Sequence, residues 1–135
     1  MGSGGERVTR RRTPTDENRT VARQLMREVP KQELKEFTAV IAPMQDLADA
    51  DPESVTAEAA LEALAALREH RPVLDARLWH LLGTAVLEGT RPVYVAANAH
   101  VPQRTLARHL ATGPATWCGR PLVPDPGRVY GWRAE

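Results

Sequence analysis

The sequence predicts a mostly α-helical protein that ends in a short β-hairpin. Ala, Leu, Val and Arg are abundant, whereas the 135 residues include three Trp, two Tyr and one Phe, a composition typical of helices that pack through aliphatic stripes. Apolar residues recur at three- and four-residue steps along much of the chain, which is the helical period. Turn-forming residues gather in Pro124-Asp125-Pro126-Gly127 and indicate the hairpin.

Residues 1–13 are expected to form a flexible basic arm. They are rich in Gly and Arg and lack apolar periodicity, so they bury too little surface to offset the entropy cost of ordering. A run of three arginines stands at positions 10–12. Such a run is most often a solvated segment, and its alternative is an arm that contacts a polyanion.

Residues 14–70 are expected to form three short helices that serve as a dimerisation or partner-binding region. The first begins at Thr13-Pro14 and ends near Pro30, Pro43 kinks or splits the second, and the third ends near His70. The apolar stripes consist of Val21, Leu25 and Val29 in the first helix, Leu34, Ile41 and Met44 in the second, and Leu61, Leu64 and Leu67 in the third. Short amphipathic helices need tertiary partners, so we expect a two-fold homodimer joined through this region.

Residues 71–135 are expected to form a second domain. A helix opens at Pro72, with Leu74, Leu78, Leu82 and Val86 facing inward, and ends at Gly89. A helix over 92–99, a turn at His100-Val101 and a helix from Pro102 or Gln103 to about Thr112 follow. This is the tri-helical layout of a helix-turn-helix. Strands over 116–118 and 128–132 would add a β-hairpin wing.

Charge is segregated along the chain although its net value is +1. Residues 1–30 contain seven basic and four acidic residues, residues 31–90 contain five basic and eleven acidic residues, and residues 91–135 contain six basic and two acidic residues. Basic ends and an acidic middle indicate a polyanion-binding part and a separate packing or partner-binding part.

The residue pattern of 89–110 fits a helix-turn-helix. Ala96 is small where the two helices would cross, and the shared core would be filled by Val95, Ala99, Val101, Leu106 and Leu110. The segment resembles the helix-turn-helix of the DNA-binding domains of Hin-type invertases and resolvases, on the strength of Gly89, Pro92, Ala96, Thr105-Leu106, Arg108 and Leu110. It departs from them at His100, where glycine is favoured. No recombinase catalytic domain accompanies it, so the resemblance implies DNA binding without strand exchange.

These observations predict a sequence-specific protein that binds double-stranded DNA, most simply a homodimeric, winged-helix regulator of transcription. The candidate DNA-contacting residues are Pro102, Gln103, Arg104, Thr105 and Arg108 in the last helix, Arg91 before the second helix, Arg10, Arg11 and Arg12 in the arm, and Arg120 and Arg128 near the hairpin. Two alternatives remain: an adaptor or antitoxin-like protein that binds a partner through its acidic helices, and a mobile-element accessory protein that bends DNA.

Other functional classes are not expected. The histidines and Cys118 do not fall in zinc-binding pairs, no catalytic constellation or phosphate loop is visible, and we expect neither an enzyme nor a cofactor. A single cysteine and the lack of a signal peptide or a sufficiently long apolar segment predict a cytoplasmic protein without a membrane span, associated with the bacterial nucleoid if it is a regulator.

Overall fold

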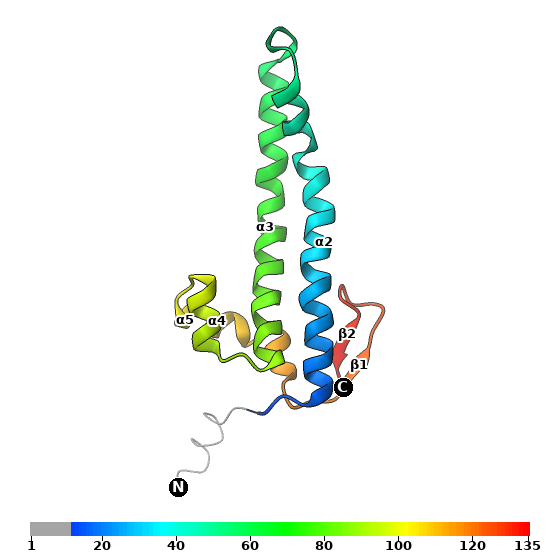
Figure 1. Cartoon of the computed structure of the whole chain (residues 1–135), viewed down its shortest axis with the longest axis vertical. Coiled ribbons are helices and arrows are strands. Elements are labelled where there is room, and N and C mark those ends of the chain that lie inside the picture. The colour runs from blue at the N-terminus through cyan, green and yellow to red at the C-terminus, as the bar shows by residue number, and fades with distance from the viewer. Residues whose placement is uncertain (1–11) are drawn as a thin grey trace.

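The computed structural model describes residues 12–135 and consists of a long helical hairpin with two small structures at its base (Figure 1). The hairpin is formed by α2 (Asp16–Asp49) and α3 (Ala57–Glu88), with the short 3-10 helix η1 (Pro52–Ser54) in the connection. Helices α4 (Pro92–Ala99) and α5 (Gln103–Leu110) lie on one side of its base. The 3-10 helix η2 (Pro114–Trp117) and strands β1 (Leu122–Pro124) and β2 (Trp132–Ala134) follow.

Both long helices are continuous through prolines, so the prediction of three short helices in 14–70 is wrong. Pro30 and Pro43 lie inside α2, and Pro72 lies inside α3. All three prolines are exposed. A proline has no amide proton to donate to the carbonyl one turn before it, but on the solvent side that carbonyl can bond to water, so the helix can bend instead of ending. The boundary expected at residues 70–71 therefore falls within one helix.

The ends of the hairpin helices are set by side-chain caps. Thr15 and Asn18 form a reciprocal capping box at the start of α2, with both bonds at 3.0 Å, and Thr56 accepts a bond from the Ala59 amide at the start of α3. Such caps satisfy amide groups that have no partner within the helix. Helix α3 ends at Gly89, whose positive φ of 122° favours glycine.

The first core lies at the base of the hairpin and joins the start of α2 to the C-terminal segment. Val21, Leu25, Leu87, Cys118 and Leu122 are buried together, so the apolar stripe predicted for the start of α2 packs within the chain. Trp117 and Trp132 pack against this cluster. The structure therefore does not separate residues 14–70 from the C-terminal half.

A polar network fixes the register of α2 against α3 above that core. Arg77 donates to Glu33 at 2.8 Å and also bonds Glu36, and His70 Nε2 lies 2.6 Å from a Glu33 oxygen. Burial raises the pKa of Glu33, but hydrogen bonds from Arg77 and His70 outweigh burial and hold this pKa below its ordinary value. The same two carboxylates raise the pKa of Arg77. The network therefore holds α2 and α3 in one register.

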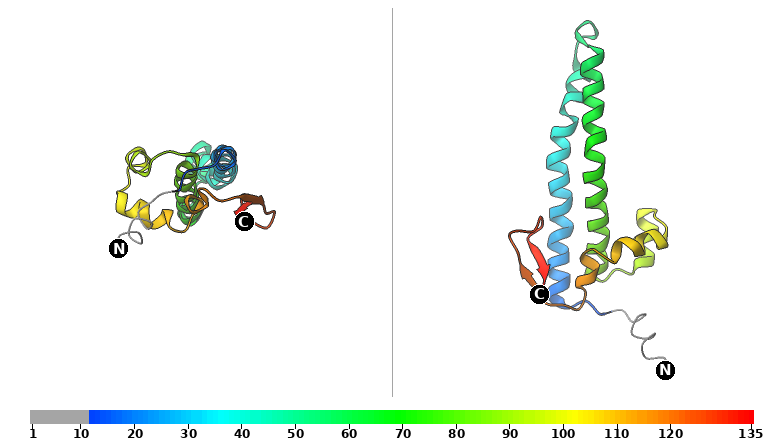
Figure 2. Two further views of the ribbon diagram at one scale, coloured as in Figure 1. Left: turned by 90° about the horizontal axis from the view of Figure 1, so that it is seen from below. Right: turned by 180° about the vertical axis from the view of Figure 1, so that it is seen from behind.

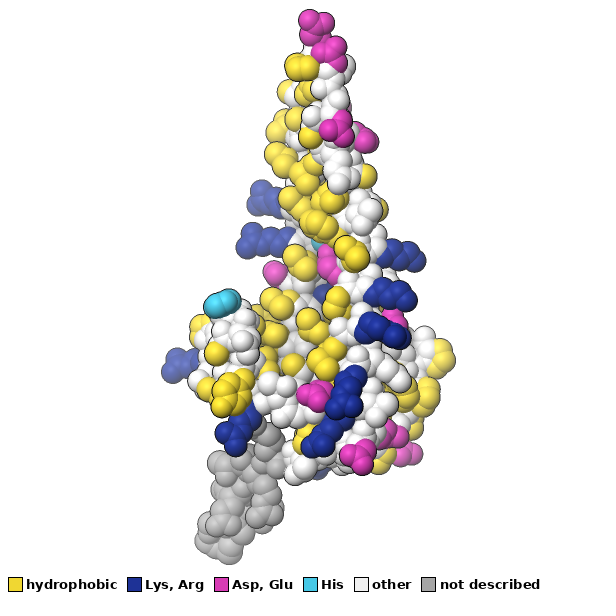
Figure 3. Space-filling view, viewed as in Figure 1, with side chains coloured by type: hydrophobic (Ala, Val, Ile, Leu, Met, Phe, Trp, Pro, Cys, Tyr) yellow, Lys and Arg dark blue, Asp and Glu magenta, His cyan; other side chains and the backbone are white. Residues whose placement is uncertain are grey.

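The hairpin arm leaves apolar side chains exposed, and the prediction that Leu74 and Leu78 face inward is wrong. Leu34, Leu61 and Leu64 are 69%, 68% and 58% exposed, and Leu74 and Leu78 are also exposed. Figure 3 shows apolar side chains along the visible face of this arm and acidic side chains at its tip. When two helices pack only against each other, each covers one face of its neighbour, and any other apolar surface stays in contact with solvent.

The two strands form an antiparallel sheet that pairs Leu122 with Ala134 and Pro124 with Trp132. The strand predicted over 116–118 is not formed, because Thr116 and Trp117 belong to η2, where Pro114 starts a 3-10 turn; the second strand begins later than expected. The sheet and helices α4 and α5 lie on opposite sides of the helix pair (Figure 2). The sheet therefore does not flank α5 as the predicted wing would.

Candidate nucleic-acid interface

Helix α4 has the expected bounds, whereas α5 ends at Leu110 and not near Thr112; a three-residue turn joins the two helices. His100 adopts the left-handed conformation at φ 57° and ψ 42°. The Val101 amide then donates to the Ala96 carbonyl at 3.0 Å, the bond that closes a helix C-terminus of the Schellman type. His100 is the one non-glycine residue with positive φ among residues 12–135, at the position where the resemblance leads us to expect glycine.

A second core holds these two helices against the end of α3. Val95, Ala96 and Leu106 are buried with Leu82 and Val86 of α3. The partly buried residues packed against them are Trp79, Ala85, Ala99, Val101, Leu110 and Ala115. The predicted shared core is thus found, with Ala96 2% exposed where two helices approach closely.

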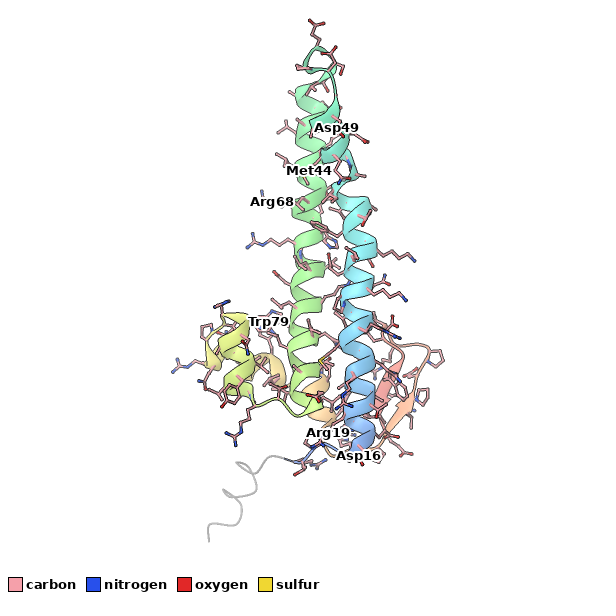
Figure 4. All side chains as sticks on the ribbon, viewed as in Figure 1. Asp16, Arg19, Met44, Asp49, Arg68 and Trp79 are labelled. Carbon is pink, nitrogen blue, oxygen red and sulfur yellow. The ribbon has the colours of Figure 1, made fainter. Side chains whose placement is uncertain are left out.

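Trp79 and His109 form a contact between α3 and α5 that was not predicted. Their rings are stacked, with centroids 3.6 Å apart and planes 5° from parallel. Figure 4 shows Trp79 on the side of α3 that faces α4 and α5. Leu106 anchors the middle of α5. The stack between Trp79 and His109 fixes the C-terminal half of the same helix. Two points of attachment set the orientation of the opposite, outward face.

The outward face of α5 carries polar and basic side chains. Gln103, Arg104, Ala107 and Arg108 are exposed, whereas Leu106 is buried and Thr105 is half-buried. The spacing 103, 104, 107 and 108 places these residues on one side of a helix. Pro102 precedes the first turn, and no side chain caps it, so the first amides of α5 remain available to an acceptor such as a phosphate oxygen.

The electrostatic environment of this face is positive. Residues 89–124 contain Arg91, Arg104, Arg108 and Arg120 and no Asp or Glu. Within residues 12–135, the ion pairs do not involve Arg91, Arg104 or Arg108. An arginine that is not neutralised by a carboxylate can pair with phosphate or with a guanine edge.

The other candidate residues are distributed over the base of the molecule. Arg91 is exposed at the start of α4, and Arg12 is exposed beside Gly119. Arg120 donates to the Glu135 carbonyl at 2.9 Å, and Arg128 pairs with Asp125 at 3.5 Å in the hairpin turn. These two therefore lie with the sheet and not with α5. Arg10 and Arg11 lie outside the described residues.

Tyr94 is a surface residue that sequence reasoning missed. It lies on α4 and is 57% exposed, two residues after Pro92 and beside the buried Val95. An exposed tyrosine can contact a partner, and tyrosine hydroxyls commonly bond phosphates. The signal was present in the sequence as the outward phase of α4, opposite Val95 and Ala99.

Two further findings bear on function. The described residues contain no group of three His, Cys, Asp or Glu side chains placed to hold a metal ion, and none of their helices is both long and apolar enough to cross a membrane. No family model, curated protein or solved structure matches the chain.

Proposed function

We propose that this protein binds double-stranded DNA through the outward face of α5 and regulates transcription as a sequence-specific homodimer. The observation that carries the proposal is the α5 face itself: Arg104 and Arg108 are exposed, are not paired with carboxylates, and stand on a helix anchored from behind by Leu106. The left-handed turn at His100 supports it, because a short turn between two helices is the layout of a helix-turn-helix.

Each element has a place in this interaction. The N-terminal half of α5 faces base edges, where Arg104 pairs with guanine and Gln103 with adenine. Arg91 and Tyr94 on α4 contact the phosphate backbone beside the groove. Arg108 lies one turn further along α5 and contacts either a base or a phosphate. Phosphate contacts position the protein, and base contacts select the sequence.

The direct test is a selection from random duplexes, followed by fluorescence anisotropy with the selected site. Arg104→Ala is expected to weaken binding by about 1–3 kcal/mol and to relax the preference at one base pair. Arg133→Ala is the matched control, because this exposed arginine lies on β2, on the opposite side of the helix pair. Unchanged affinity and preference in Arg104→Ala would reject α5 as the reading helix.

Arg108 and the N-terminal arm are distinguished by salt dependence. Removal of a phosphate contact weakens binding to every duplex and lowers the slope of affinity against salt by about one, whereas removal of a base contact alters preference. Deletion of residues 1–13 is expected to lower affinity, since it removes Arg7, Arg10, Arg11 and Arg12; it also removes the Arg12 carbonyl that accepts a bond from Cys118 Sγ, so circular dichroism must first show that the shortened chain is folded. Equal binding of the shortened and full-length chains at low salt would make the arm a passive tail.

We propose the exposed apolar face of the hairpin arm as the dimer contact. Leu61 and Leu64 are largely exposed on α3, and Leu64 lines a groove of about 500 Å³ together with Phe37 and Leu74. Two hairpins that pair through this face complete a four-helix bundle. Two-fold pairing would then repeat the α5 helices for half-sites about 34 Å, or a multiple of that distance, apart.

Sedimentation equilibrium of the full chain tests the dimer. Leu61→Gln with Leu64→Gln is expected to convert a dimer into a folded monomer, because neither side chain supports the monomer core. Val129→Gln is the control, since Val129 is 86% exposed but lies in the C-terminal hairpin. A wild-type chain that remains monomeric at high micromolar concentration would reject this contact.

A protein-binding adaptor is the second candidate, and the same arm favours it. Residues 36–67 carry seven acids and no Lys or Arg, so the exposed leucines there stand in an acidic setting that suits a basic, apolar partner. Binding to such a partner, together with a lack of duplex binding at low salt, would establish the adaptor and exclude the regulator.

A further inference from the structure

A cavity of about 670 Å³ lies between α3 and the C-terminal segment, away from the proposed DNA face. Its apolar wall includes Val73 and Ala76 of α3, and its aromatic wall consists of Trp117, Tyr130 and Trp132. This volume is within the usual range for small-molecule sites, which are mostly apolar with a few polar groups. Three of the six Trp, Tyr and Phe residues of the chain meet at this one place.

The aromatic wall suits a flat ring. Tyr130 lies against His80, with ring centroids 4.4 Å apart, and Trp117 meets His80 edge-on at 6.5 Å. His80 Nε2 is buried and has no hydrogen-bond partner among the described residues. Burial also lowers the pKa of His80, so the imidazole is neutral at pH 7 and acts as part of the aromatic surface. Buried polar atoms without partners are uncommon in proteins.

The charge of the cavity suits an anion. Its two charged lining residues are Arg77 and Arg128, and no Asp or Glu is among its lining residues in the described part of the chain. Arg77 is held in place by Glu33 and Glu36. The side chain of Arg128 is 61% exposed, and its contact with Asp125 is 3.5 Å long. Arg128 is therefore the guanidinium that can turn toward a bound carboxylate.

We infer that this cavity binds a small planar aromatic carboxylate, with its ring against Trp117, Tyr130 and Trp132 and its carboxylate at Arg128. A flat ring fills the space with little loss of conformational entropy, and stacking on aromatic side chains fixes its plane. The guanidinium at the mouth selects the acid over a neutral ligand of the same shape, because a charge-assisted bond replaces its weak contact with Asp125.

The ligand would contact an element that supports α5. Trp117 belongs to η2, and the first residue of η2, Pro114, packs against Gly83 of α3 so closely that a Cβ on Gly83 would lie 3.0 Å from its ring. Residues of η2 also contact α5. A ligand that shifts Trp117 would thus move the support of the helix proposed to read DNA. The effect on DNA rests on the proposed function, whereas ligand binding does not.

The test is isothermal titration calorimetry of the full chain with 1-naphthoate and with 1-naphthamide, its neutral counterpart. Naphthoate is expected to bind about tenfold more tightly, the ratio that one charge-assisted hydrogen bond contributes at a half-exposed site. Arg128→Gln should remove this ratio. Arg133→Gln is the matched control, since Arg133 also pairs with Asp125, at 3.3 Å, but does not line the cavity. Ala76→Trp fills the cavity from an exposed helical position and should abolish binding of both compounds.

Circular dichroism first establishes that each variant is folded. Equal affinity for the two naphthalene compounds, or an equal loss in Arg133→Gln, would overturn the anion assignment. Unchanged binding in folded Ala76→Trp, or no binding of either compound to the wild type, would overturn the cavity itself. A change in duplex affinity on addition of naphthoate tests the link to α5 separately. Ligand binding by a chain that does not bind DNA would refute the proposed function and leave this site standing.

Discussion

Asn18 joins the first turn of α2 to the C-terminal segment, and Asn18→Ala is predicted to lower the free energy of unfolding by about 3 kcal/mol. The side chain is fully buried and makes three hydrogen bonds. Its oxygen accepts from the Thr15 and Gly119 amides at 3.0 and 2.8 Å, and its amide donates to the Arg120 carbonyl at 3.0 Å. Each bond contributes about 1 kcal/mol net, and the loss of all three gives the predicted sum.

Urea unfolding followed by circular dichroism measures this change. With a slope of about 2 kcal/mol per molar urea for a small protein, the midpoint should fall by roughly 1.5 M. Thr15→Ala is the matched control: it removes the other half of the capping box but leaves Gly119 and Arg120 bonded, so it should cost about 1 kcal/mol. A loss in Asn18→Ala no larger than in Thr15→Ala would show that the link across about a hundred residues contributes nothing.

Three other predictions concern the pH dependence of stability, the core beneath α5 and the turn at His100. The pKa of both Glu33 and Glu36 lies below the ordinary value of 4.5. The stability that these carboxylates contribute is therefore present above pH 4.5 and is lost as the pH falls through their pKa values in the folded state. Glu33→Gln should flatten the dependence of the unfolding free energy on pH between pH 6 and 3. Leu106→Ala should cost about 3 kcal/mol in urea unfolding and loosen α5, since Leu106 is 1% exposed. His100→Gly should raise the melting temperature slightly because glycine adopts the left-handed turn without strain, whereas His100→Val should lower it.

The sequence located α4 and α5 because local signals determine them. Pro92 begins one helix, His100 tolerates the left-handed turn, and Gly113-Pro114 follows the end of the other. Their core also followed from the spacing of Val95, Ala96 and Leu106, since a short helix with one buried face has few alternatives.

The hairpin could not be predicted in the same way. Whether Pro30, Pro43 and Pro72 end a helix or bend it depends on which side of the helix meets solvent, and this is settled by packing between segments far apart in sequence. The pairing of Val21 and Leu25 with Leu87, Cys118 and Leu122 is of that kind. The aromatic cavity depends on it as well, since Trp117 and Tyr130 reach α3 only through the fold of the C-terminal segment.

The length of the arm holds the acidic residues of its tip far from the basic residues at its base. A helix of 32 residues is about 48 Å long, several times the Debye length of about 8 Å at physiological ionic strength. The acids of the tip therefore lie too far from the base to weaken the attraction for DNA that the proposed function requires. Under the proposed function, DNA phosphates would repel the acidic tip and attract the arginines at the base, so the chain would approach DNA with α4 and α5 leading.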